Sequence, residues 1–512
     1  MRPRGSDDNN YMKPLSGLDG AFLSLETPAT PMHVGSLHLF QVPPRYRGNF
    51  RNAVKKMIST HLHLAPVFRR RLAQMPLQFA NPVWVHEGVD LDFHIRRVDL
   101  PPPRSWRQVQ DCVGELHGEL LDRSRPLWML YVFEGLESGD NAYYIKIHHS
   151  LLDGQAGAAL AAALFELSPT PGRVERHPRA RDAERTPGAL TLAAAAFRHD
   201  AAQYVKLVRH LPDVVRALAG MVLGGGKPAP PRASTKGSAG GALWRNIAFG
   251  PRTPFNAAIT GERGVAAASI PLDEVKAVAH AQEATVNDVV LALCSGALRR
   301  YLARHGGIPR KPLIATMPIS LRDPGNREFT TQATLSLVSL ATHIADPLRR
   351  LRAIRSAASA TKSVAQRARS VIPVDFPTIG GPWIVGALAA MYGKTRLANA
   401  IPPIANVVIS NVAGPPVPLY TAGLRMTGYW PFSIVEHGVG LNITLMSYAG
   451  MLGIGFTAAK SLVPEPQELV DDMLAAQQEL QRAALRRPKP RRAAARVAAR
   501  NSGVGKAARK HV

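Results

Sequence analysis

A strand that ends in two histidines and is followed closely by a helix is the feature that most restricts the fold. Residues 142–147 alternate with the period of two typical of a β-strand, and His148 and His149 come directly after them. Asp153 and Gly154 then open an alanine-rich stretch with helical spacing, where an aspartate can cap the helix and a glycine allows unusual backbone angles. This order of elements indicates a mixed α/β (α+β) fold rather than a helical bundle.

Similar patterns predict strands and helices along most of the chain. In the first half the predicted strands are 34–42, 129–136 and 142–147, and the predicted helices are 50–62, 106–121 and 155–167. In the second half the predicted strands are 312–319, 333–342, 404–410 and 439–446, and the predicted helices are 287–304 and 466–485.

The length of 512 residues and the breaks in composition predict more than one domain. We expect an N-terminal lobe at 14–168, which carries the histidine motif, and a C-terminal lobe at 244–485. The region between them, 169–243, combines a polar loop, an amphipathic helix with a basic face, and a Gly-rich linker. That helix either packs as a bridge across the two lobes, which we favour, or lies on a membrane.

Basic residues outnumber acidic ones, 63 against 37, which gives a formal charge of +26. A field of this sign attracts nucleic acid, acidic lipid headgroups or phosphate-bearing substrates. Part of the charge lies in the tail 486–512, which has no acidic residue and is typical of a disordered extension. Attachment of the tail to an anionic membrane or to nucleic acid is the alternative. Residues 1–13 are also expected to be disordered, and they lack the apolar region of a secretory signal.

Two further features bear on the compartment. The chain has two cysteines, which exclude a disulfide framework and a multi-cysteine zinc site. No stretch of 18 or more uninterrupted apolar residues occurs, so no spanning helix is expected. We therefore expect a cytoplasmic protein, with a peripheral position on a membrane face as a further option.

Histidine suits proton transfer near neutral pH because its unperturbed pKa is about 6.5. A histidine at a strand end can take the proton of an acceptor hydroxyl and return it to a leaving group. The chain has no Gly-x-Ser-x-Gly elbow for a covalent acyl-enzyme. The alternative interpretation of the motif is a polar loop with an Asp-Gly turn. We expect no metal site, because no His-Glu-x-x-His motif or cysteine pair accompanies His148, His149 and Asp153.

Several segments, spread in order over about 450 residues, support a family resemblance. They are PLSGLDGAFLSLETPATPMHVGSLHLF (14–40), Pro126-Leu127-Trp128 leading into HHSLLDG (148–154), Asn287-Asp288, TMPISLRDPG (316–325), SNVAGPPVPLY (410–420) and GLNITLMSYAGMLGIGFTAAK (440–460). In these segments the chain resembles the bacterial wax ester synthase/acyl-CoA:diacylglycerol acyltransferase family. Ala413 departs from the family pattern, which commonly has proline there, and this affects the expected loop geometry.

The resemblance implies two chloramphenicol-acetyltransferase-like lobes, joined by the helical linker, that meet at a tunnel. It implies transfer of a fatty acyl group from acyl-CoA, a substrate rather than a cofactor, to diacylglycerol or a long-chain alcohol. His149 is then the general base, while His148 supports the loop. Asp153, next to Gly154, orients the loop through an ion pair with a cation that the sequence does not identify. Contact with an anionic membrane or a lipid droplet surface is also expected, and nucleic acid is not.

The remaining predicted site residues each have a structural alternative. Asn287 and Asp288 are expected to line the site from the second lobe, or else to belong to a helix N-terminus capped by Asn287 or Thr285. Pro126, Leu127 and Trp128 are expected to contact the acyl chain, or else to anchor the core.

Two alternative functions remain open from the sequence. One is acyl transfer to a different alcohol acceptor. The other is a lipid-surface binding protein whose catalytic site is vestigial. The basic tail and the apolar stretch 383–392 motivate this interpretation.

Overall fold

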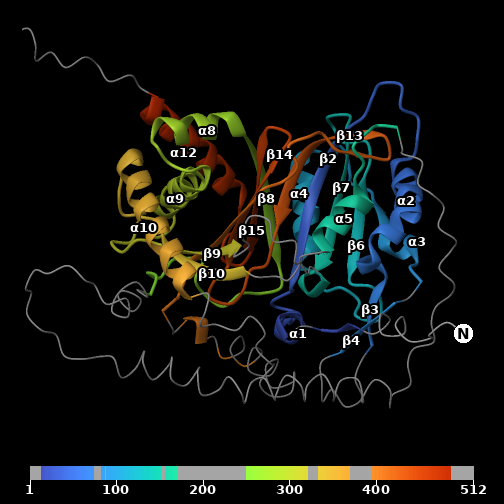
Figure 1. Cartoon of the computed structure of the whole chain (residues 1–512), viewed down its shortest axis with the longest axis horizontal. Helices are drawn as coiled ribbons and strands as arrows, with labels where there is room; N and C mark the ends of the chain where they lie inside the picture. The colour runs from blue at the N-terminus through green and yellow to red at the C-terminus, as the bar shows by residue number, and fades with distance from the viewer. Residues whose placement is uncertain are drawn as a thin grey trace, which may run out of the picture.

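Two six-stranded mixed sheets, each covered by helices, form two lobes that lie side by side (Figure 1). The computed structural model describes residues 13–15, 17–73, 82–86, 88–151, 156–170, 249–320, 333–368, 391, 395, 397–399 and 402–485. The predicted mixed α/β class with two lobes is therefore confirmed. Most of the linker 169–243, the terminal segments 1–12 and 486–512, and the stretch 383–390 lie outside the described residues.

The first sheet carries the histidine motif near its centre. Its strands, in spatial order, are β12 (Tyr420–Thr421), β13 (Leu424–Phe432), β2 (His33–Gln41), β7 (Asn141–His148), β6 (Trp128–Phe133) and β5 (Ile95–Val98). Neighbouring strands are antiparallel except for β5 and β6, which are parallel. The helices of this half are α1 (Gly17–Leu25), α2 (Phe50–His61), α3 (Leu91–His94), α4 (Trp106–Gly118) and α5 (Ala156–Leu164). A small sheet joins β1 (Lys13–Pro14), β4 (Val83–His86) and β3 (Arg70–Ala73).

The second sheet runs in the order β10 (Ala333–Ser339), β9 (Ile314–Ser320), β11 (Val407–Val412), β14 (Leu441–Tyr448), β15 (Met451–Ala459) and β8 (Arg263–Pro271). The central strand β11 is parallel to both of its neighbours, and the other pairs are antiparallel. Its helices are α8 (Leu272–Ala281), α9 (Val286–Arg304), α10 (Pro347–Ala368) and α12 (Gln467–Leu485). Helices α9, α10 and α12 pack against one another, and α9 carries a long run of buried residues in the core of this lobe.

Most predicted elements are confirmed within a few residues. Among the strands, 142–147 corresponds to β7 and 439–446 to β14, while the predicted helix 287–304 corresponds to α9. The sequence did not predict β8, β13 or β15. Among the described residues, no helix combines the length and the apolar character needed to cross a membrane.

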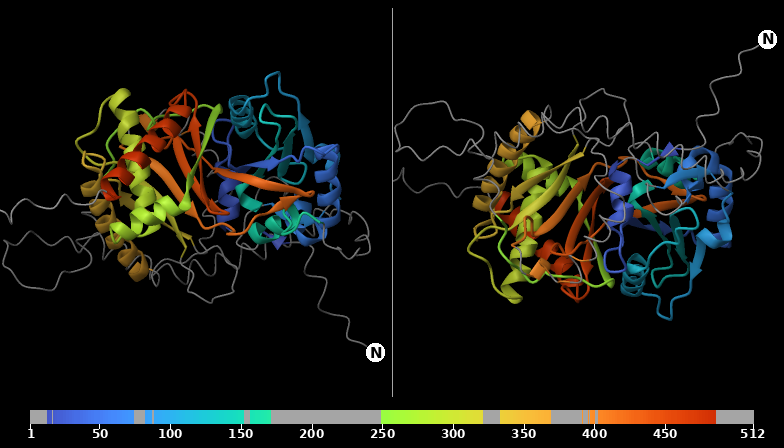
Figure 2. Two further views of the ribbon diagram at one scale, coloured as in Figure 1. Left: turned by 90° about the horizontal axis from the view of Figure 1, so that it is seen from above. Right: turned by 90° about the horizontal axis from the view of Figure 1, so that it is seen from below.

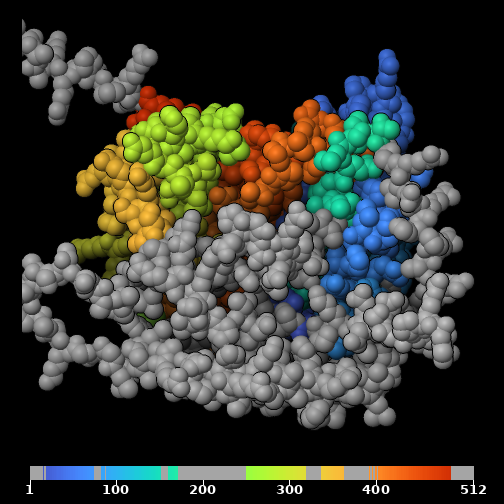
Figure 3. All heavy atoms as spheres, in the orientation of Figure 1, coloured from blue at the N-terminus to red at the C-terminus, as the bar shows by residue number. Residues whose placement is uncertain are grey.

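One hairpin crosses between the lobes. Strands β12 and β13 belong to the second half of the chain, yet β13 pairs with β2 of the first sheet from Arg425 opposite Gln41 to Phe432 opposite Gly35. The orange residues of this segment reach into the blue and teal lobe in the ribbon views (Figure 2), and orange residues border teal ones on the surface (Figure 3). The two sheets are therefore not each built from one continuous stretch of the chain.

Helix α4 and strand β8 form a second, closely packed junction between the lobes. Gly114 of α4 lies so near β8 that a Cβ there would be 2.7 Å from the backbone oxygen of Arg263. The Gln110 side chain accepts a hydrogen bond from the Ala267 amide over 2.7 Å. A small residue in the helix thus lets the two backbones approach, and a buried amide fixes their register.

Candidate active site

The backbone at the end of β7 is held on two sides. His148 is opposite His33 in the ladder with β2, and its amide donates to the carbonyl of Leu127 over 3.0 Å. His149 begins a short 3-10 helix, His149–Leu151, and its amide donates to the carbonyl of Met32 over 2.9 Å. The positions of both histidines are therefore fixed by strand-like contacts rather than by a free loop.

The side chain of His148 is fully buried beneath the strand end. Its Nδ1 lies 2.7 Å from the Ser150 hydroxyl, and its Nε2 lies 3.3 Å from Oε1 of Glu26. A ring engaged at both nitrogens has one preferred orientation, so His148 is placed to support its neighbour.

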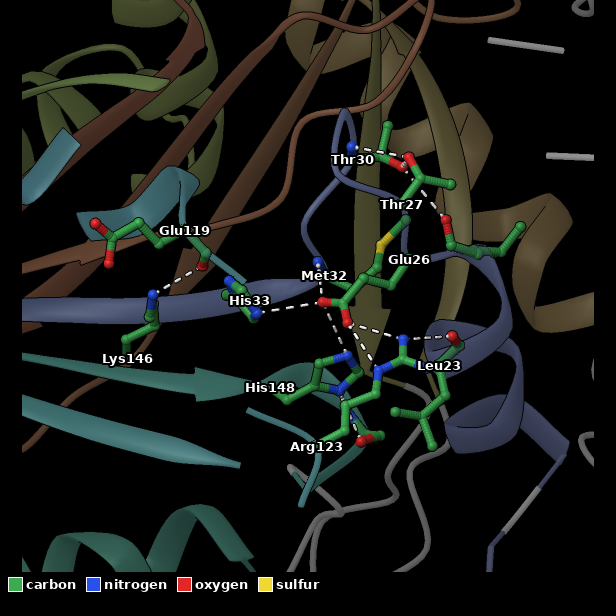
Figure 4. A network of polar contacts seen from close by, with 12 residues as sticks. Leu23, Glu26, Thr27, Thr30, Met32, His33, Glu119, Arg123, Lys146 and His148 are labelled. Carbon is green, nitrogen blue, oxygen red and sulfur yellow. Dashed lines mark hydrogen bonds and ion pairs between the residues drawn. The ribbon is translucent and has the colours of Figure 1, made fainter. Parts of the chain in front are cut away.

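Glu26 is the centre of this polar network (Figure 4), and its side chain is only 2% exposed. Its Oε1 also lies 3.2 Å from Nε2 of His33 and accepts the Met32 amide, while its Oε2 accepts from the Arg123 guanidinium over 2.8 Å. Burial alone would raise the pKa of the Glu26 carboxyl, but the contacts with His148 and His33 outweigh it and hold this pKa below its usual range. Glu26 is therefore ionised at neutral pH.

His33 lies under the same network as a neutral ring. Burial lowers the pKa of His33 to about 4, against the opposing effect of Glu26, and the ammonium of Lys146 contributes in the same direction as burial. Lys146 is itself buried and donates to the carbonyls of Leu116 and Glu119 at the end of α4. This cation thus completes the helix end while it disfavours a proton on His33.

His149 differs from its neighbour because its side chain stays partly exposed. The ring stacks on Phe22 of α1, with 4.0 Å between centroids and 24° between planes. Desolvation lowers the pKa of His149 to about 4, and the nearby His148 acts in the same direction. At pH 7 the ring is therefore neutral, which is the form that can accept a proton.

The other predicted site residues are placed as follows. Asp153 and Gly154 lie outside the described residues. Asp288 is buried in a capping box, where its carboxylate accepts from the amide and the hydroxyl of Thr285 over 2.9 and 2.7 Å. Asn287 is partly exposed, and its Oδ1 lies 3.4 Å from Nδ2 of Asn411. The capping interpretation is confirmed with Thr285 as the N-cap, and a substrate contact of Asn287 or Asp288 stays a prediction.

The Pro126–Trp128 segment lies in the core next to the motif. Trp128 is fully buried, stacks on His94 with 4.4 Å between centroids, and donates from Nε1 to the carbonyl of Phe68. Leu127 is also fully buried and supplies the carbonyl that holds the backbone of His148. The core-anchor interpretation fits these contacts, and contact with an acyl chain stays a prediction.

The sequence reasoning did not single out Glu26, His33 and Arg123. Glu26 and His33 stand in the 14–40 segment that carries part of the family resemblance, so that segment was the available signal. Their contacts with His148 and Arg123 join positions about 100 residues apart, which periodicity within the chain does not report.

Comparison with solved structures identifies the fold. The chain matches the structure of the first condensation domain of the calcium-dependent antibiotic synthetase with a TM-score of 0.51, at 14% identity, covering 93% of this chain and 97% of that one. At this identity the likeness concerns the fold alone. The chain also matches the structure of the wax ester synthase/diacylglycerol acyltransferase from Marinobacter aquaeolei VT8, with a TM-score of 0.65 and 28% identity, over 92% of this chain and 100% of that one.

Sequence comparison then gives the family. The wax ester synthase/diacylglycerol acyltransferase catalytic domain matches residues 15–290, and the C-terminal domain of the same family matches residues 331–481. The Mycobacterium tuberculosis H37Rv protein named "Probable diacyglycerol O-acyltransferase tgs2" is 34% identical over 475 residues, covering 91% of this chain and 98% of the relative. The chain belongs to the wax ester synthase/diacylglycerol acyltransferase family, as the resemblance predicted.

Proposed function

We propose that the protein transfers a fatty acyl group from acyl-CoA to the free hydroxyl of diacylglycerol, with His149 as the general base. His149 takes the hydroxyl proton while the oxygen attacks the thioester carbon. The tetrahedral intermediate then expels the coenzyme A thiolate, which receives that proton from the imidazolium. The products are an ester and the free thiol, and no covalent acyl-enzyme is required.

The observation that carries this proposal is the contrast between the two adjacent histidines. His148 is fully buried and engaged at both ring nitrogens, whereas His149 is neutral, partly exposed and stacked on Phe22. The first residue can orient and the second can react. The family membership and the names of the relatives support diacylglycerol as the acceptor.

The proposal is tested by His149→Ala, with ester formation measured from radiolabelled palmitoyl-CoA. Loss of the base should lower the transfer rate by a factor of roughly 10² to 10⁴ without a change in thermal stability. His280→Ala is the matched control, because His280 is exposed on α8, away from the site. Full activity of a folded His149→Ala protein would remove His149 from the reaction.

Long-chain alcohols are the second candidate acceptors, since the family and its Marinobacter member carry both activities in their names. The purified protein should be given palmitoyl-CoA with diacylglycerol and hexadecanol together. The ratio of triacylglycerol to wax ester then ranks the two acceptors. Tight liposome binding with no ester from either acceptor would favour the vestigial lipid-binding alternative.

We also infer that the protein touches an anionic lipid surface from the cytoplasmic side. Phe249 and Ile404 support this, because they are 50% and 59% exposed on segments joined by the Gly250–Pro403 hydrogen bond, and the chain is strongly basic. The double substitution Phe249→Ser with Ile404→Ser should weaken flotation with vesicles containing anionic lipid. Leu64→Ser, an exposed position in the first lobe, should not.

A further inference from the structure

One face of the second sheet is turned toward the first sheet. Gly453 and Gly455 of β15 have no side chains on this face because a Cβ at either position would collide with the carbonyls of Tyr429 and Pro431 in β13. Two positions further along β15, the Thr457 hydroxyl accepts a hydrogen bond from the Ser433 amide over 3.1 Å. Gly453, Gly455 and Thr457 therefore mark the face that looks toward the first sheet.

The ladder extends this face across the sheet, since residues opposite one another on neighbouring strands point to the same side. One row runs from Gly455 through Thr444 of β14 to Ser410 of β11. The adjacent row runs from Thr457 through Asn442 and Val408 to Thr316 of β9. The first row thus changes from glycine to hydroxyl side chains as it leaves β15, and the second row carries hydroxyl and amide side chains and Val408.

The contacts between this face and the segment of β13 and the residues after it end at β14. Asn442 and Thr444 are buried and engaged, with Asn442 Nδ2 donating to the carbonyl of Ile434 and the Thr444 hydroxyl donating to Asn442 Oδ1. Thr316 and Ser410, on strands inside the sheet, are partly exposed. Within the described part of the chain, neither of these two hydroxyls has a hydrogen-bond partner. Thr316 and Ser410 are therefore two partly exposed hydroxyl residues on the inner face of the sheet.

This open wall begins next to the catalytic end of the first sheet. β13 ends at Phe432, opposite Gly35, and the chain continues past that end through Ser433 and Ile434. Ile434 is bound by Asn442, and the Ser433 carbonyl lies 3.2 Å from Nε2 of His117. Two residues before Gly35, β2 begins at His33, opposite His148. The row that contains Thr457, Asn442 and Thr316 therefore starts beside the end of the β2–β13 pair at which the histidine motif lies.

We propose that Thr316 and Ser410 form a subsite that hydrogen-bonds the uncharged polar groups flanking the reacting centre of the substrate. The wall carries hydroxyl and amide groups but no charged side chain in either row, so it suits amide or ester groups rather than phosphate. Two sources supply such groups: the amides of the pantetheine arm of acyl-CoA and the ester carbonyls of diacylglycerol. This inference rests on the function proposed above.

The test uses Thr316→Val, which keeps the side-chain shape, Ser410→Ala, and the double variant of the full chain. KM is measured separately for palmitoyl-CoA, diacylglycerol and hexadecanol. Loss of one hydrogen bond should raise the affected KM about three- to tenfold with little change in melting temperature. Thr427→Val is the control, because Thr427 is exposed on β13 away from this wall.

The outcomes separate the sources. A KM increase for diacylglycerol alone identifies ester carbonyls of the acceptor, and an increase for palmitoyl-CoA with both acceptors identifies the pantetheine amides. Unchanged KM values in folded, active variants overturn the subsite while leaving the proposed function intact. S-hexadecyl-coenzyme A, a thioether that cannot react, is titrated as an independent probe. A wild-type protein that neither turns over nor binds this probe overturns both proposals.

Discussion

Glu26 illustrates, at the scale of single residues, how the site depends on a buried charge. Its carboxylate contacts two histidines, one backbone amide and Arg123, so its charge is shared among groups from three separate parts of the chain. A buried ion of this kind is stable only while its partners are present.

We predict that Glu26→Gln weakens both the fold and the reaction. The amide keeps the shape but removes the negative charge that pairs with Arg123, and the free energy of unfolding should fall by about 2 kcal/mol, less than for a fully buried pair because Arg123 is 38% exposed. A reoriented His148 should lower kcat by roughly tenfold. The corresponding change at exposed Asp92, Asp92→Asn, removes a carboxylate that pairs with Arg51 and Lys55 in solvent, and its effect on stability should be much smaller than that of Glu26→Gln. Equal losses at both positions would contradict the role given to Glu26.

The site also shows what the sequence could not provide at this scale. The local pattern of residues 142–149 was enough to place His148 and His149 at a strand end, because alternation and position in the chain are local properties. The Glu26–His148 contact depends on α1 folding back beside β7, and the exposure of His149 depends on what covers the motif. Both are tertiary properties, so they became visible only with the fold.

At the scale of elements, the packing of α4 on β8 depends on the absence of a side chain at Gly114. Glycine in a helix interior is usually unfavourable by about 1 kcal/mol relative to alanine. Here the backbone oxygen of Arg263 occupies the space that a methyl group would need. The local cost of glycine is outweighed by the close approach of the two lobes.

We therefore predict that Gly114→Ala lowers the free energy of unfolding by about 1–3 kcal/mol, although alanine is the better helix former. Denaturant unfolding of the purified variant measures this. Gly88→Ala is the control, since nothing lies within 4 Å of a Cβ at Gly88, and its effect should stay within about 0.5 kcal/mol. A Gly114→Ala protein that is more stable than the wild type would show that the α4–β8 junction can accommodate a methyl group.

Two of the strands that the sequence analysis did not predict, β13 and β15, share a physical cause. In β15, Gly453 and Gly455 interrupt the side-chain alternation by which a strand is recognised, and the reason for both glycines is contact with β13. In β13, Gly428 and a bulge between Met426 and Gly428 break the period in the same way. Strands shaped by contact between the lobes therefore carry a weaker local signal than strands shaped by burial alone.

At the scale of the whole molecule, several buried histidines make stability depend on pH. Burial lowers the pKa of His33, His94 and His149 to about 4 and that of His38 to about 3, all below the unperturbed value of 6.5. Between these limits the unfolded chain binds protons that the folded chain does not, so stability rises with pH in this window.

We predict that the free energy of unfolding falls steadily from pH 6.5 to pH 4.5. Below about pH 4.5, protonation of Glu26 should remove a further contribution, because the pKa of its carboxyl is lowered in the folded state. Urea titrations at fixed ionic strength measure the slope. An equal free energy of unfolding at pH 7.5 and pH 5 would contradict this prediction. It would mean that these histidine rings bind protons in the folded protein as readily as in the unfolded chain.

The hairpin of residues 420–432 has a consequence for synthesis of the chain. Until that segment leaves the ribosome, β2 has no neighbour on one side, and its backbone amides and carbonyls on that side remain unsatisfied. An N-terminal fragment that includes the histidine motif but stops short of the hairpin would therefore present a bare strand edge prone to aggregation. The order of translation thus delays completion of the sheet that carries His148 and His149 until most of the polypeptide exists.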